Sequence, residues 1–137
     1  MSGKLLTTKM RIAIFFDIAY YSLLIILPLI ATVSAKNKEK EKTKNYIIVT
    51  LVLLLLMMIN FLFIAVRNEQ VKRYYNMLLL ILFASAVITI VALVEITKDE
   101  SNYDYVKNLT MAVSIIQIFL LLLYLFNLIS ALVNFMK

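Results

Sequence analysis

One carboxylate lies deep within an apolar stretch of this sequence, and it is the side chain best placed to do chemistry. Asp17 follows five apolar residues at positions 12–16 and precedes a long run of Ile, Leu and aromatic residues. A charged Asp at the centre of a membrane helix is unfavourable by roughly 2.5–3.5 kcal/mol, and by less toward the interface. Asp17 therefore either bonds to protein groups or marks the path of a proton or cation.

Three further polar residues are predicted to lie at a similar depth, each in a different apolar segment. Counted from one end of the segments, Asp17 lies about five residues in, Asn60 six, Asn127 about eight and Ser85 ten. An amide can donate to a carboxylate and accept from a carboxylic acid. The count predicts one intramembrane polar layer, which consists of Asp17, Asn60, Ser85 and Asn127.

Three hypotheses fit this layer. In the first, hydrogen bonds between helices fix their register, each contributing about 0.6 kcal/mol on average. In the second, the layer contacts a transmembrane helix of another protein. In the third, it is a proton or cation site, and Gln117 and Thr89 extend a polar path through the other half of the membrane. Against the third, the sequence places no second acid or base at the depth of Asp17.

A second set of small and polar residues recurs at helical spacing. Ser85, Thr89 and Ala92 share one helix face, and polar residues interrupt segment 109–136 at spacings near three, four and seven. Lipid offers polar groups no hydrogen-bond partner, and small residues let helices approach closely. We therefore expect a helix-packing or partner face, made of Thr89, Ala92, Ser114, Gln117 and Tyr124.

The elements that must position these side chains are four long apolar segments. Of the 137 residues, 64% are hydrophobic, compared with about 45–50% in soluble domains. Each segment reaches the ~20 residues that a spanning helix needs. We predict an all-α membrane protein, a single domain over residues 1–137. Its four transmembrane helices form an up-down-up-down bundle with short loops, and the spans are 12–34, 46–66, 75–96 and 109–136.

Local features refine this prediction. Pro28 is expected to kink the first helix or loosen its last turns. Residues 36–44 are rich in Lys and Glu and are predicted to form a solvated loop. Tyr74 and Tyr75 are predicted to anchor the third span at the interface. A cleavable signal peptide is disfavoured for the first segment, because its apolar stretch exceeds the usual 7–15 residues and contains Asp17.

Several kinds of chemistry lack their residues here. The chain has no Cys and no His, which excludes disulfides, thiolate catalysis, His-metal sites and imidazole catalysis. The single glycine is Gly3, so no glycine-rich phosphate loop exists. Asp17 has no second intramembrane carboxylate beside it in the sequence, so we expect no enzyme, no cofactor and no metal site. The net charge of +6 comes from Lys and Arg beside the spans, which we expect to contact lipid headgroups rather than nucleic acid.

The basic residues do not decide the orientation. The Lys and Arg divide equally, with seven on the side of the termini and seven on the other side. Both termini are expected on the same side of a plasma or inner membrane. Six of the seven loop acids lie on the other side, which favours a cytoplasmic location for the termini, and dual insertion stays open.

Two functions remain. The first is a small non-catalytic subunit, an assembly or scaffold protein, or an accessory factor such as an immunity protein. It would act through helix–helix contacts in the bilayer, with another membrane protein or a second copy of itself as partner. The alternative is a homo-oligomeric channel or small transporter with a polar path past Asp17, Asn60 and Asn127.

Overall fold

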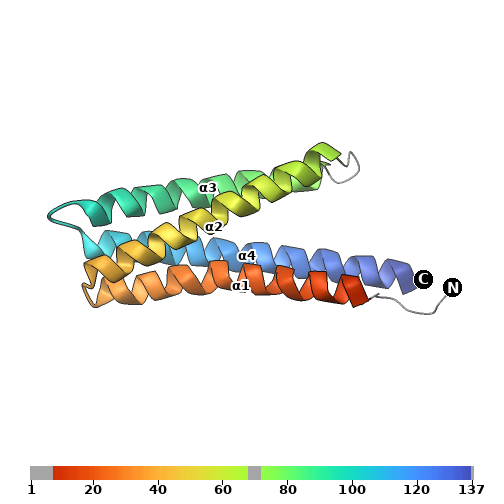
Figure 1. Cartoon of the computed structure of the whole chain (residues 1–137), viewed down its shortest axis with the longest axis horizontal. Helices are drawn as coiled ribbons and strands as arrows, with labels where there is room; N and C mark the ends of the chain where they lie inside the picture. Colours follow the sequence, from red (N-terminus) through yellow and green to blue (C-terminus); the bar gives the residue numbers. More distant parts are fainter. Residues whose placement is uncertain (1–7, 68–71, 137) are drawn as a thin grey trace.

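Four α-helices make up the described part of the chain, which is residues 8–67 and 72–136 of a computed structural model. Each helix contains a stretch long and apolar enough to cross a membrane. The predicted all-α fold with four transmembrane helices is therefore confirmed (Figure 1), and the helices are α1 (Thr8–Lys36), α2 (Lys40–Arg67), α3 (Lys72–Thr97) and α4 (Tyr103–Met136).

The helices alternate in direction, as the up-down-up-down prediction requires. The α1–α2 and α3–α4 turns lie together at one end, which we call the loop end (Figure 1). The start of α1 and the end of α4 lie at the opposite end, which we call the terminal end. α1 packs against α4 and α2, and α3 packs against the same two helices.

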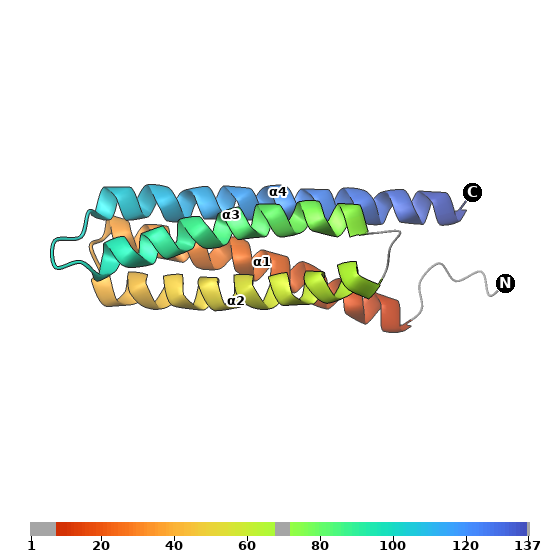
Figure 2. The same cartoon turned by 90° about the horizontal axis from the view of Figure 1, so that it is seen from above.

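The bundle is not uniform along its length. Toward the terminal end, α2 and α3 diverge from α1 and α4 (Figure 1), and α1 and α4 reach beyond the other two helices (Figure 2). α4 has 34 residues, or roughly 51 Å at the rise of an α-helix, against ~30 Å of hydrocarbon. A helix of this length must tilt in the bilayer or extend beyond the hydrocarbon.

The predicted loop at residues 36–44 is mostly helical, which corrects the sequence interpretation. Only residues 37–39 separate α1 from α2. Lys and Glu are good helix formers, and neither Gly nor Pro occurs here to stop the helix. In the tight turn that remains, Lys38 has a φ of 60°, and the Glu39 amide donates to the Ser34 carbonyl at 2.9 Å.

Pro28 is buried inside α1, and the helix continues through it to Lys36. The expected loosening of the last turns is therefore not seen. The Thr32 hydroxyl donates to the Pro28 carbonyl at 2.8 Å.

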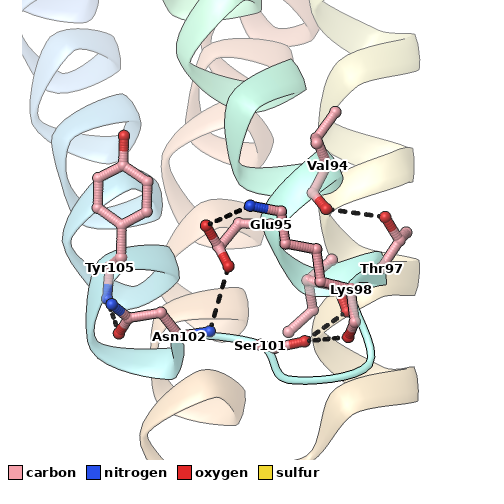
Figure 3. A network of polar contacts seen from close by, with 8 residues as sticks. Val94, Glu95, Thr97, Lys98, Ser101, Asn102 and Tyr105 are labelled. Carbon is pink, nitrogen blue, oxygen red and sulfur yellow. Dashed lines mark hydrogen bonds and ion pairs between the residues drawn. The ribbon is translucent and has the colours of Figure 1, made fainter.

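The turn between α3 and α4 is held by a polar network (Figure 3). The Glu95 carboxylate accepts from the Lys98 ammonium at 3.4 Å and from the Asn102 backbone amide at 3.3 Å. The Asn102 side chain accepts from the Tyr105 amide at 3.1 Å and so caps α4. Ser101 donates to the carbonyls of Ile96 and Lys98.

Most large side chains on the outside of the bundle are apolar and exposed, as Leu80 and Phe126 illustrate. Inside, a cluster rich in alanine lies toward the loop end, and a cluster rich in Leu and aromatic residues lies toward the terminal end. In lipid, packing and interhelical hydrogen bonds hold helices together, since lipid tails are as apolar as the core. The three buried alanines of the first cluster are Ala31, Ala35 and Ala92.

The loop predicted between Arg67 and Arg73 lies largely outside the described residues. The same holds for Lys4 and Lys137, which were counted on the side of the termini.

Candidate functional site: a tyrosine-lined cavity

Buried polar groups pair across the interior of the bundle. The Ser114 hydroxyl of α4 donates to the Ile25 carbonyl of α1 at 2.7 Å. The hydroxyls of Thr32 and Thr110 join the same two helices at 2.7 Å. Between α4 and α3, the Gln117 amide nitrogen donates to the Ser85 hydroxyl at 3.0 Å.

The predicted packing face lies inside the bundle. Thr89, Ala92, Ser114 and Gln117 are all buried, and Tyr124 is half-buried. Their neighbours are helices of the same chain, so the face needs no second protein to shield most of its polar groups from lipid.

One polar atom stays without a partner. Within the described part of the chain, no group bonds to the Oε1 atom of Gln117, although this side chain is 0% exposed. An unpaired buried acceptor is unfavourable by about 1–3 kcal/mol.

The four residues of the predicted polar layer do not bond to one another. Ser85 pairs with Gln117, and the exposed Asn127 donates to the Leu123 carbonyl of its own helix at 2.8 Å. The Asp17 carboxylate accepts from the Tyr124 hydroxyl at 2.9 Å. The residue count gave depth along each helix but not direction around its axis, and α4 directs Tyr124 rather than Asn127 at Asp17.

The structure does bring Asp17 and Asn60 to one cavity. It has a volume of about 260 Å³ and lies toward the terminal end, where the two helix pairs diverge (Figure 1). All four helices contribute to its lining. Besides Asp17, Asn60 and five apolar side chains, the lining contains five of the chain's eight tyrosines, which are Tyr20, Tyr21, Tyr74, Tyr75 and Tyr124.

Aromatic rings of the lining pack against one another in two groups, which together form an aromatic wall. The ring centroids of Tyr21 and Tyr124 are 5.1 Å apart, and those of Tyr74 and Tyr75 are 5.3 Å apart. Tyr75 also meets Phe61 edge-to-face at 5.1 Å and 69°. These are favourable aromatic geometries, so the rings support one another. Tyr20 is fixed separately, because its hydroxyl donates to the Leu53 carbonyl of α2 at 2.6 Å.

The cavity opens between α1 and α2. The lining residues that are exposed come from these two helices, namely Phe16 and Asp17 from α1 and Leu56 and Asn60 from α2. The lining residues from α3 and α4 are buried or half-buried and form the back wall. The opening therefore lies in the apolar outer surface, at the depth of the lipid tails near one interface.

The sequence interpretation missed the aromatic wall, although a signal for it exists. Tyr20 and Tyr21 follow Asp17 by three and four residues, which places all three side chains on one helix face. Tyr74 and Tyr75 were interpreted only as interface anchors, and the structure shows that they also line the cavity.

The lining has a distinct chemical character. Among the described residues that line it, Asp17 is the only acid and none is basic, and the remaining surface is mainly aromatic and aliphatic. Across the described residues, no three His, Cys, Asp or Glu side chains gather into a metal site. The cavity is therefore suited to a solute that is positively charged or donates hydrogen bonds.

Comparison with known proteins supplies no further guide. None of the protein-family models, curated proteins and solved structures that were searched matches this chain.

Proposed function

We propose that this protein is a non-catalytic membrane transporter, and that Asp17 binds its substrate, a small cation, in the cavity. The observation that carries the proposal is the cavity itself, which holds an intramembrane carboxylate. Ionisable groups inside membrane domains mark ion and proton pathways. This is the transport alternative of the sequence analysis, with Asp17 and Asn60 at the site and Asn127 outside it.

The environment of Asp17 supports a binding role better than a structural one. Its carboxylate accepts a hydrogen bond from the Tyr124 hydroxyl, but the Asp17 side chain is exposed at the opening of the cavity and is not buried between helices. The interior hydrogen bonds that hold register are made by other residues, such as Ser114 and Gln117. The bundle can therefore be held together without this acid.

Cation flux through reconstituted protein tests the proposal. Liposomes containing the protein and a pH-sensitive dye receive a pH gradient, with the membrane potential clamped by valinomycin and K⁺. We expect the gradient to collapse several times faster than in protein-free liposomes. Asp17→Asn should abolish the difference, because the amide cannot hold a proton or balance a cation.

Asp104→Asn is the matched control, since Asp104 is an exposed carboxylate in the first turn of α4, at the loop end. It should leave the flux unchanged. Absence of both proton flux and uptake of a small organic cation by the wild-type protein, or flux that survives Asp17→Asn, would overturn the transport proposal.

A second candidate function is that of an accessory subunit which binds another membrane protein, or itself, through its outer helix faces. The observation in its favour is a set of exposed amides between apolar side chains, at Asn60, Asn76 and Asn127. Lipid gives an amide no hydrogen-bond partner, whereas a neighbouring transmembrane helix does.

Purification in mild detergent tests this second function. A stoichiometric partner or a defined oligomer that is lost in Asn76→Leu supports it, because that substitution removes an exposed amide that does not line the cavity. A strict monomer in both detergent and lipid bilayers argues against it.

For either function, we propose that the termini face the cytoplasm, which a reporter fused after Lys137 tests.

A further inference from the structure

We propose that the cavity recognises an organic ammonium ion, with a quaternary or tertiary ammonium head among the tyrosines and an apolar tail in the bilayer. This inference rests on the proposed function, because it names the cation that the Asp17 site takes.

The lining of the cavity combines one carboxylate with several aromatic rings. An ammonium group is attracted to the face of a Tyr ring within about 6 Å of its centroid, and more strongly where water is excluded. The rings of Tyr74 and Tyr75 both line the cavity and meet at 76°, so their faces point in different directions. The Asp17 carboxylate adds a negative charge that balances the positive charge of the ammonium head group.

Few side chains in the described lining carry a carboxylate or amide oxygen. A hard metal ion such as Mg²⁺ or Ca²⁺ takes six or more oxygen ligands. Of the described residues in the lining, only Asp17 has a carboxylate and only Asn60 has an amide side chain, and the hydroxyls of Tyr20 and Tyr124 already donate elsewhere. Aromatic faces bind an organic cation that keeps no ordered water shell, and they cannot replace the water of a hard ion.

The size of the cavity and the position of its opening also favour a small head group with an apolar tail. The cavity of about 260 Å³ has room on the order of eight water molecules, at ~30 Å³ for each. That space suits a small head group rather than a whole amphiphile. Phe16 and Leu56 flank the opening and are 64% and 52% exposed, so a tail can leave the cavity between α1 and α2 directly into hydrocarbon.

The test measures binding of hexyltrimethylammonium by calorimetry to the full chain in maltoside detergent. We expect saturable binding that exceeds uptake by empty micelles. Hexyl sulfate and hexanol have the same tail with a negative and a neutral head, and they should not bind saturably. Asp17→Asn should weaken binding roughly tenfold or more, and Asp104→Asn should leave it unchanged.

The tyrosines provide an independent variant pair. Tyr75→Phe keeps the ring face, so its affinity should stay within about threefold of wild type. Tyr75→Leu removes the face and should weaken binding roughly three- to thirtyfold. Because Tyr75→Leu also removes the contact with Phe61, its helix content and elution volume are compared with those of Tyr75→Phe before affinities are interpreted.

Two sources of such a head group are distinguished by adding lipid. If the natural ligand is a choline lipid, phosphatidylcholine in the micelles will compete with hexyltrimethylammonium, and phosphatidylglycerol will not. If the ligand is a free amphipathic amine, neither lipid will compete. Equal or weaker binding of the cation relative to hexanol, or binding that survives Asp17→Asn, would overturn the inference.

The outcomes also separate this inference from the transport proposal. Asp17-dependent proton flux without hexyltrimethylammonium binding rejects the organic cation and keeps transport. Asp17-dependent binding with neither proton flux nor uptake of hexyltrimethylammonium into the liposomes rejects transport and keeps the ammonium site.

Discussion

The two ends of this bundle accommodate polar side chains in different ways. From the loop end to the middle, small residues and hydroxyls are buried between closely packed helices, and Ser114 and Thr110 bond directly to α1 or its side chains. At the terminal end the helix pairs diverge around a cavity, and Asp17 and Asn60 are exposed at its opening. The difference teaches that polarity at one end serves packing, whereas polarity at the other is left available to a ligand.

Cysteine labelling should reveal the largest difference between the ends. The chain has no cysteine, so single substitutions give a clean background. A thiol reacts as the thiolate, which needs water. We expect a charged, water-soluble thiol reagent to label Asn60→Cys faster than Gln117→Cys by on the order of tenfold or more.

Phe63→Cys is the control for this experiment, because Phe63 is exposed on the same helix but does not line the cavity. It should label slowly, as a thiol surrounded by lipid does. Equal labelling of positions 60 and 63 would show that the cavity is not hydrated, and the comparison would fail.

Overpacking should produce the next largest effect. Ala92 is 0% exposed at the loop end, so Ala92→Leu forces extra atoms into a packed interface and should lower the free energy of unfolding by about 1–3 kcal/mol. Ala84→Leu, on the exposed side of the same helix, should change it by less than about 0.5 kcal/mol. Unfolding in mixed detergent and SDS micelles measures both.

Loss of one hydroxyl should have a moderate effect. Ser85→Ala leaves the buried Gln117 amide without the acceptor that it has in the wild type, and we expect a loss of about 1 kcal/mol. Gln117→Leu in the same background should restore most of the lost stability, since the amide and its unpaired oxygen are then gone.

Asp17→Asn at the exposed terminal end should change the free energy of unfolding by less than about 0.5 kcal/mol, measured in the same micelles.

The smallest effect concerns the turn at the loop end. Lys38 has a φ of 60°, a conformation that glycine adopts without the steric cost of a Cβ atom. Lys38→Gly should raise the free energy of unfolding by about 0.5–1 kcal/mol. Lys36→Gly, at the last position of α1, should not stabilise. A loss of stability in Lys38→Gly would contradict this account of the turn.

The fold was predictable because hydrocarbon imposes a simple rule on sequence. Four runs of apolar residues must be helices, since a spanning backbone has to satisfy its own hydrogen bonds. The face of Ser85, Thr89 and Ala92 followed from helical periodicity, and all three are buried. The helical start of α2 at Lys40 was missed because a charged segment beyond the span was equated with a loop.

The site was only partly predictable. Asp17 stood out because of its charge, and Asn60 because of its depth. Their surroundings depend on how each helix is rotated and on the divergence of the pairs, and neither can be read from residue counts. Five tyrosines from three helices meet at the cavity, and only the spacing of Tyr20 and Tyr21 from Asp17 carries that information in sequence.

The hydroxyls of the interior have a consequence for biogenesis. Thr50, Thr89 and Thr110 each donate to the carbonyl four residues earlier in their own helix. Each helix thus satisfies these groups before it meets a neighbour, so a ribosome-bound chain can release its segments into lipid one at a time. In the described chain Gln117 has no such local acceptor, and its amide nitrogen donates instead to the Ser85 hydroxyl of α3. The fourth segment is therefore the one that gains most from finding the third already in place.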